Sequence, residues 1–172
     1  TVNGRSVRYT ERMGSTNFTA QEDAFYVDSG LTYSGAPVTT LSGLHHLEGE
    51  AVQVLADGAE VTGRVVTGGQ ITLDEAASVV HVGPGYSSDL MTLPLAFEAA
   101  PAGGQGLTKN VSGVALRVTQ SSLVQAGPRF DRLTEYPARQ VSDPYGSPPA
   151  LRTGEFRFAI GPSWTSDGAV CV

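Results

Sequence analysis

Two adjacent histidines lie close to two carboxylates in the segment LHHLEGE, at positions 44–50. Imidazole nitrogens and carboxylate oxygens are common ligands for zinc. The candidate ligands are the side chains of this segment and the one remaining histidine, namely His45, His46, Glu48, Glu50 and His81. Neighbouring residues of an extended chain point to opposite sides, so the paired histidines do not easily share one ion. A metal site is therefore the weaker of two interpretations of this segment.

The second interpretation of LHHLEGE is a structural corner that leads into a strand. Leu44 and Leu47 would pack in the core, and His46 and Glu48 would hold the loop through hydrogen bonds. We favour this structural corner, expect no bound metal and no cofactor, and test the idea against the geometry below.

Other chemically suggestive residues are poorly placed for catalysis. The segment GYSSD at 85–89 approaches the nucleophile-elbow pattern but has Asp89 where the pattern needs glycine, so Ser87 and Ser88 are better explained as turn residues. Cys171 lies in an apolar run, where cysteine usually behaves as a small buried hydrophobe. Carboxylate pairs occur at 22–23 and 74–75, in predicted turns. We expect no enzyme; a hydrolase acting on cell-wall polymers is the alternative that these serines leave open.

Two aromatic side chains are candidates for a binding surface. Tyr145 lies in the proline-rich loop 142–150, and Trp164 lies in the loop 161–168. Exposed aromatic rings can bind sugars, but aromatics are only 8% of the chain and there is one tryptophan. A tryptophan in such a loop also commonly fills a core edge or a subunit contact. We mark Tyr145 and Trp164 as a candidate interaction loop.

Composition limits the partners. The chain has 172 residues and a formal net charge of −6, without a cluster of basic residues. Binding to nucleic acid by counterion release needs such a cluster, so we expect no sequence-specific nucleic-acid partner. No apolar run approaches the roughly 20 residues of a membrane helix, so we expect no membrane insertion. A single cysteine excludes an internal disulfide.

The elements that would position these residues are strands. AVQVLA at 51–56 alternates, the pair Asp57 and Gly58 suits a two-residue hairpin turn, and the chain returns with Val61 and Val65 in phase. A second turn at Gly68 and Gly69 leads to strands at 70–73 and 78–83, separated by the link DEAA. We predict a four-strand meander over 51–83.

The remaining apolar runs also alternate with a period of two. EFRFAI at 155–160 places Phe156, Phe158 and Ile160 on one face, and we pair this run with AVCV at 169–172 as a hairpin. No segment has the spacing of an amphipathic helix over three turns. The predicted fold is all-β, with a small meander β-barrel at 39–84 inserted in a larger antiparallel β-sandwich-like domain formed by 1–38 and 85–172. Because the sequence begins at Thr1 and ends within an apparent strand, we expect it to be a fragment of a longer protein.

Several segments together resemble a known family. These are VRYTERM, EDAFYVDSGLTY, LSGLHHLEGEAVQVLADG, GGQITL, ASVVHVGPGYSSDLMTLPL and PPALRTGEFRFAIGPSWTSDGAVCV. They resemble the tubular tail, or nozzle, proteins of short-tailed phages and prophages. In that family a Leu-x-His-Leu-Glu-Gly segment precedes a strand and an Asp-Gly turn, and here Leu44, His46, Leu47, Glu48 and Gly49 occupy those positions.

The resemblance implies a structural component of a virion tail. Such proteins form rings, often sixfold, around a DNA channel, and contact other tail proteins. It therefore implies a homo-oligomeric ring in the virion tail, and the bacterial cytoplasm as the place of assembly. The alternative is a module of a tail protein that binds a host-surface glycan or receptor. The resemblance supplies no catalytic residues.

Overall fold

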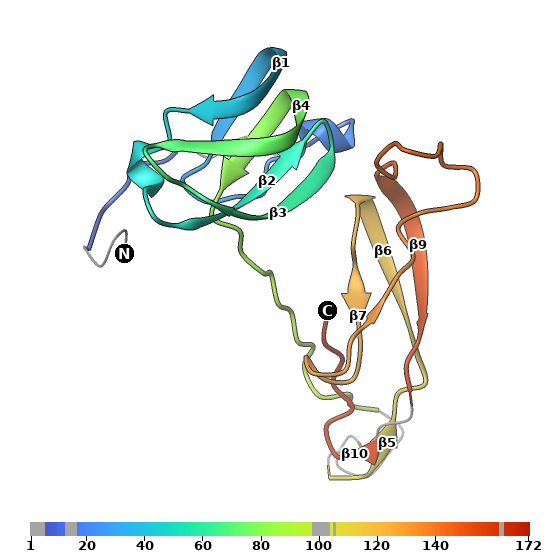
Figure 1. The fold of residues 1–172 in the computed structure, drawn as a ribbon. Coiled ribbons are helices and arrows are strands. Elements are labelled where there is room, and N and C mark those ends of the chain that lie inside the picture. Colours follow the sequence, from blue (N-terminus) through green and yellow to red (C-terminus); the bar gives the residue numbers. More distant parts are fainter. Residues whose placement is uncertain (1–5, 13–16, 98–103, 105, 162–163) are drawn as a thin grey trace. The chain divides into compact units, whose positions relative to one another are not determined.

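The computed structural model describes residues 6–12, 17–97, 104, 106–161 and 164–172. Within them, the regular elements are strands and two single-turn 3-10 helices, η1 (Gln21–Asp23) and η2 (His45–Leu47), with no α-helix. The all-β prediction is confirmed (Figure 1). The chain forms two compact units, Thr1–Ser87 with Pro144–Pro148, and Ser88–Asp143 with Pro149–Val172. This division differs from the predicted insert at 39–84.

The first unit contains one antiparallel sheet of four strands. They are β1 (Leu31–Ser42), β2 (Ala51–Ala56), β3 (Ala59–Val65) and β4 (Gln70–Gly83). Their order is β1-β4-β2-β3, so β4 lies between β1 and β2 instead of following β3. The predicted meander is therefore wrong in its topology. The predicted boundary between 38 and 39 also falls inside β1, which pairs with β4 along most of its length. The strand order has two ends, at β1 and β3, which differs from the ring of strands in the predicted barrel.

β4 is one continuous strand where the sequence suggests two. The predicted link DEAA lies inside it, at 74–77. The register explains the irregular sequence, because Val38 pairs with Ala77 but Thr40 pairs with Thr72, so four residues of β4 oppose one residue of β1. A bulge of this kind bends the strand without ending it. The polar link is thus a bend in a strand, not a connection between strands.

A second bulge changes which side chains of β3 face the core. Val54 pairs with Val61 and Val52 pairs with Arg64, so β3 carries one extra residue between these pairs. Gly63 adopts φ +72° there. One extra residue reverses the alternation beyond it. Val66 is consequently buried and Val65 is 53% exposed, whereas strict alternation predicted Val65 in phase with Val61.

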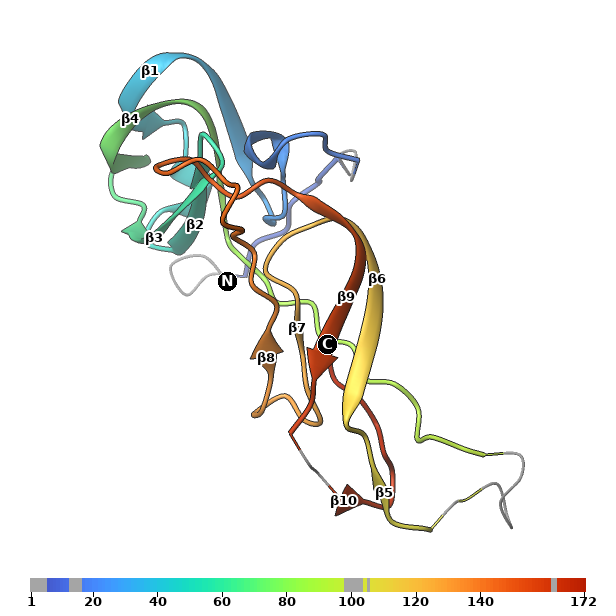
Figure 2. The ribbon, with the colours of Figure 1, turned by 90° about the vertical axis from the view of Figure 1, so that its right-hand side faces the viewer.

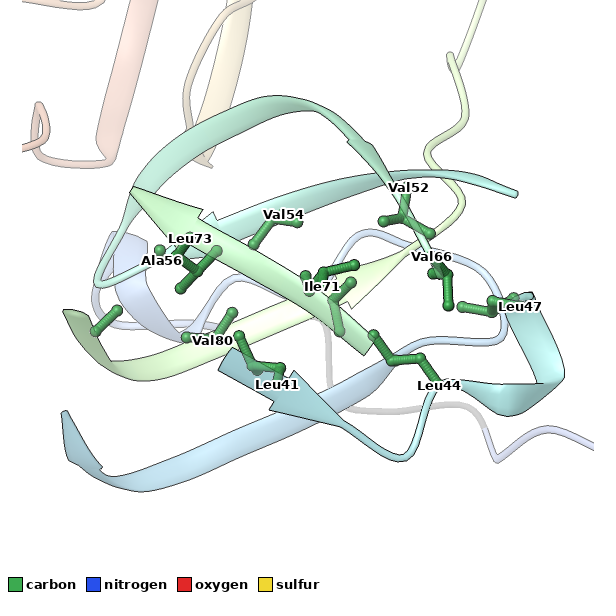
Figure 3. Packing of buried hydrophobic residues seen from close by; sticks show 12 residues of the cluster. Leu41, Leu44, Leu47, Val52, Val54, Ala56, Val66, Ile71, Leu73 and Val80 are labelled. Carbon is green, nitrogen blue, oxygen red and sulfur yellow. The ribbon is translucent and has the colours of Figure 1, made fainter. Parts of the chain in front are cut away.

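The core of the first unit lies between the strands of the curved sheet (Figure 3). Val52, Val54 and Ala56 of β2 are all buried, as their alternation predicted. The other buried members of the cluster are Leu41, Leu44, Leu47, Val66, Ile71, Leu73, Ala77, Val80 and Val82.

The second unit contains two longer strands and four strands of two residues each. They are β5 (Lys109–Asn110), β6 (Gly113–Ser121), β7 (Gln125–Ala126), β8 (Thr134–Glu135), β9 (Arg152–Ala159) and β10 (Trp164–Thr165). β6 pairs with β9, β7 with β8 and β5 with β10. β6 and β9 run side by side in Figure 2.

The C-terminal run pairs differently from the prediction. Cys171 forms antiparallel bridges with Met91 and with Gly127, while β9 pairs with β6, so the predicted hairpin of 155–160 with 169–172 is wrong. Phe156, Phe158 and Ile160 are buried, as their alternation predicted. Phe156 stacks on Tyr136 with ring centroids 3.9 Å apart and near-parallel planes. Local alternation identified the inward face of β9, but not its partner strand.

Candidate functional site

The segment LHHLEGE forms a tight corner between β1 and β2. Leu44 and Leu47 are each 1% exposed and belong to the core cluster of the first unit. The backbone N–H of Leu47 donates to the carbonyl of Leu44 at 2.8 Å, which closes the single turn of η2. The turn places both leucines toward the core (Figure 3). Burial of two leucines makes this corner part of the folding core.

Glu48 fastens the corner to the turn between β3 and β4. Its carboxylate accepts hydrogen bonds from the backbone N–H of Gly69 at 2.6 Å and of Gly68 at 2.8 Å. These two bonds, that of Gly69 first, lower the pKa of Glu48 below its ordinary value, because they stabilise the ionised form. Both glycines have positive φ, as a two-residue turn of this type requires. Each oxygen of the Glu48 carboxylate therefore accepts one backbone hydrogen bond from the turn.

The two histidines of the corner contact different residues. The Nε2–H of His46 donates to the carbonyl of Ser29 at 2.8 Å, and its own carbonyl accepts from the Tyr9 hydroxyl at 2.8 Å. The ring of His45 covers Gly69, where an added Cβ would lie 2.2 Å from His45 Nδ1. The adjacent imidazoles thus diverge, as expected for neighbouring residues.

His81 also has both ring nitrogens engaged. Nε2–H donates to the carbonyl of Glu22 at 2.9 Å, and Nδ1 lies 2.8 Å from the Thr32 hydroxyl. Burial lowers the pKa of His81, opposed by the Glu22 hydrogen bond and the charge of Asp23. A neutral imidazole with a proton on Nε2 satisfies both contacts, so His81 connects η1 to the sheet.

Asp57 has a role that turn propensity alone did not predict. Asp57 and Gly58 have φ of +46° and +80°, and join β2 to β3 in a two-residue hairpin turn. The Asp57 carboxylate also accepts from the backbone N–H of Val79 at 2.8 Å and of Ser78 at 3.1 Å. The side chain therefore ties the turn to β4 just beyond its bulge. The only sequence signal for this second function is an acidic residue in a turn, which is too common to be specific.

The residues considered for catalysis are not assembled into a reactive group. Within the described residues, no three His, Cys, Asp or Glu side chains converge as metal ligands would. Ser87 and Ser88 lie in an extended segment that continues toward Met91, without the helix that follows a nucleophile elbow. Cys171 is buried at 2% exposure among the strands of the second unit.

The two candidate aromatic residues are both exposed, in different units. Tyr145 is 103% exposed in the first unit, and Trp164 is 70% exposed in the second. Trp164 pairs with Asn110 and so belongs to the short strand β10 instead of the predicted loop. Residues 162–163 of that predicted loop lie outside the described residues.

Sequence reasoning missed an uncharged segment of the second unit, residues 90–97, which we call the apolar strip. It runs antiparallel to 167–172, with Leu90 N–H bonded to the carbonyl of Val172 at 2.9 Å and Thr92 N–H bonded to that of Val170 at 2.9 Å. Its large side chains are exposed by 40–85%, namely Leu90, Met91, Leu93, Leu95 and Phe97. The sequence shows an uncharged and mostly apolar run, but only the structure shows that it remains uncovered.

A cavity of about 560 Å³ opens beside the apolar strip. Met91, Phe130 and Cys171 contribute apolar surface to it, and Arg129, Asp131 and Asp167 contribute charged groups. Arg129 and Asp131 form an exposed ion pair at 2.9 Å. The cavity and the strip are therefore adjacent parts of one surface, joined at Met91.

Comparisons with known proteins add no family assignment. No protein-family model matches the chain, and no curated protein matches it. Among the described residues, none of the helices has the length and apolar character needed to cross a membrane.

Proposed function

We propose that this chain is a structural component of a bacteriophage or prophage tail that assembles into a ring or tube by protein–protein contacts, and that it has no catalytic role. The observation that carries the assembly function is the apolar strip, because five large apolar side chains lie exposed on one short segment. Exposed apolar surface of this extent is typical of interaction sites. The tail itself is proposed from the sequence segments that resemble nozzle proteins.

The contacts of the corner support the same proposal. The side chains of the Leu-x-His-Leu-Glu-Gly segment, which carries much of the resemblance, are engaged in packing or hydrogen bonding. Glu48 accepts a hydrogen bond from the backbone of Gly69, and His46 donates one to the carbonyl of Ser29. Such a segment maintains a fold and performs no reaction. The buried core of the first unit and the exposed apolar strip of the second support a role in assembly. We propose the virion tail as its location, with assembly in the bacterial cytoplasm.

The experiment that tests this function is light scattering of the purified protein over a range of concentrations, with negative-stain images of the same peak. Closed rings or tubes of uniform diameter are the expected result. A particle that stays monomeric at every concentration would contradict self-assembly.

A module that binds a host-surface glycan or receptor is the second candidate. It is favoured by Trp164, which is 70% exposed, and by the neighbouring Thr165 and Asp167 in the lining of the cavity. Aromatic faces next to carboxylates and hydroxyls suit a sugar ring. A glycan array that compares the natural chain with Trp164→Ala tests this second candidate. Hits that are lost in the variant support glycan binding, and an array without hits contradicts it.

A further inference from the structure

We propose that His81 is a pH-sensitive latch that holds residues 21–28, which we call the cover segment, against the sheet of the first unit at neutral pH and releases them on acidification. This inference goes beyond the proposed function and does not rest on it. Side chains alternate along β4, so Val80 and Val82 face the core and His81 faces the other side of the sheet. The cover segment contacts the ring of His81 on that other side, so its release leaves the core in place.

The cover segment is held at both of its ends. At the first end, the Nε2–H of His81 donates to the carbonyl of Glu22 at 2.9 Å, and the Phe25 ring meets the imidazole edge-on with centroids 5.4 Å apart. At the second end, the backbone N–H of Asp28 donates to the carbonyl of Pro84 at 2.9 Å. The contacts of His81 are therefore the ones that fasten η1 to the sheet.

The cover segment has the features of a part of the chain that opens locally. None of its residues is buried, and its regular structure is the single turn η1. The two backbone hydrogen bonds of that turn, from Asp23 to Ala20 and from Ala24 to Gln21, are both 3.2 Å long. Segments with few buried contacts and exposed backbone hydrogen bonds open at low free-energy cost. The cover segment can thus detach while the sheet stays folded.

Protonation of His81 acts against the closed arrangement. The residue is 7% exposed, and the neutral ring accepts the Thr32 hydroxyl at Nδ1, with 2.8 Å between the two atoms. A second ring proton turns Nδ1 into a donor and places a positive charge where the cover segment excludes water. Burial lowers the pKa of His81 from its ordinary 6.5, and the Glu22 hydrogen bond and the charge of Asp23 oppose this effect. Release exposes the ring and relieves the effect of burial, so acid favours the open form.

The charged groups on the elements packed against His81 are all carboxylates, namely Glu22, Asp23, Asp28 and Asp57. Of these, Asp23 has a charge that raises the pKa of His81. β1 and β2 pair with His81 at Thr32 and Leu55, and neither strand carries a charged residue. A change at Asp23 therefore alters the electrostatics of the latch without removing a contact of the ring.

The test measures hydrogen exchange of the full chain from pH 8 to pH 5, by mass spectrometry from milliseconds to minutes and corrected for the intrinsic rate at each pH. Carboxyl groups ordinarily stay ionised in this range. Protection of the cover segment should fall by up to about thirtyfold, the limit for an open ring of ordinary pKa and a closed ring that stays neutral. The amides of β4 should keep their protection.

Two variants test whether His81 is the latch. His81→Gln retains a side-chain donor for the Glu22 carbonyl but cannot titrate, so protection of the cover segment should no longer depend on pH. Asp23→Asn removes the charge that favours the protonated ring, so the midpoint of the His81 ring titration, followed by NMR, should move to lower pH. Asp28→Asn is the matched control, because this carboxylate is in the same segment and its charge is not a cause of the shift.

Three outcomes overturn the latch. They are constant protection of the cover segment from pH 8 to pH 5, a pH dependence that persists in His81→Gln, and a loss of protection in β4 that matches the loss in the cover segment. If circular dichroism shows that His81→Gln does not fold, Asp23→Asn decides alone. A lower ring midpoint with a matching shift in the protection curve then supports the latch, and an unchanged midpoint overturns it.

Discussion

Among the described residues, twelve buried side chains form one core cluster in the first unit, whereas three form the buried cluster of the second. The first unit also has carboxylates that fasten its turns, Glu48 at Gly68 and Gly69 and Asp57 at Ser78 and Val79. The second unit places comparable apolar side chains on its surface, in the apolar strip. The first unit therefore contains most of the buried core, and the second unit exposes the apolar strip.

The largest expected effect tests whether a buried leucine at the corner contributes more to the free energy of unfolding than an exposed leucine on the strip. Leu47→Ala should lower the free energy of unfolding by about 2–5 kcal/mol, because it removes buried methyl groups and leaves a cavity. Leu93→Ala, the matched control in the second unit, should change it by less than about 0.5 kcal/mol. Urea unfolding followed by circular dichroism measures both. Similar losses in the two variants would contradict the comparison.

A smaller effect is expected at the bulge of β3. Gly63 has φ +72°, and no atom lies within 4 Å of an added Cβ. Gly63→Ala should therefore cost roughly 1–2 kcal/mol through backbone strain alone. Gly161→Ala is the control, because its backbone is not left-handed and its added Cβ meets only an ordinary contact at 3.5 Å. Thermal unfolding that ranks the two variants equally would show that the bulge tolerates side chains.

The smallest expected effect concerns the charge on Glu48, whose carboxylate is accessible to solvent. Glu48→Gln should lower the melting temperature at pH 7, because Gly68 and Gly69 donate to different carboxylate oxygens and the glutamine amide offers only one oxygen, a weaker acceptor than a carboxylate. The pKa of Glu48 is lowered in the folded state, so its stabilisation is present above about pH 4.5 and is lost as the pH falls through the folded value.

The difference between the natural chain and the Glu48→Gln variant should consequently shrink as the pH falls below about 4.5. His81 also reduces stability as the pH falls below about 6.5, because its folded pKa is lowered, but it does so in both proteins and cancels in the difference. A difference that stays constant from pH 7 to pH 3 would show that the carboxylate charge contributes nothing to the corner.

The sequence by itself determined the local features of this protein. Alternation identified the buried face of β2 and the inward residues Phe156 and Phe158 of β9, since side chains alternate along any strand. Turn chemistry marked Asp57 with Gly58 and Gly68 with Gly69, because few residues adopt positive φ. The spacing of LHHLEGE identified the two leucines and the two polar side chains whose contacts now define the corner.

Only the tertiary structure decided which strands meet and which surfaces stay open. Strand order depends on contacts between segments distant in sequence, so β4 could join β1 to β2, and Cys171 could bridge Met91 and Gly127, without any local signal. One extra residue at Gly63 moved the buried position from Val65 to Val66, because register is a property of paired strands. The apolar strip is uncharged and mostly apolar in sequence, and its exposure depends on what the rest of the chain leaves uncovered.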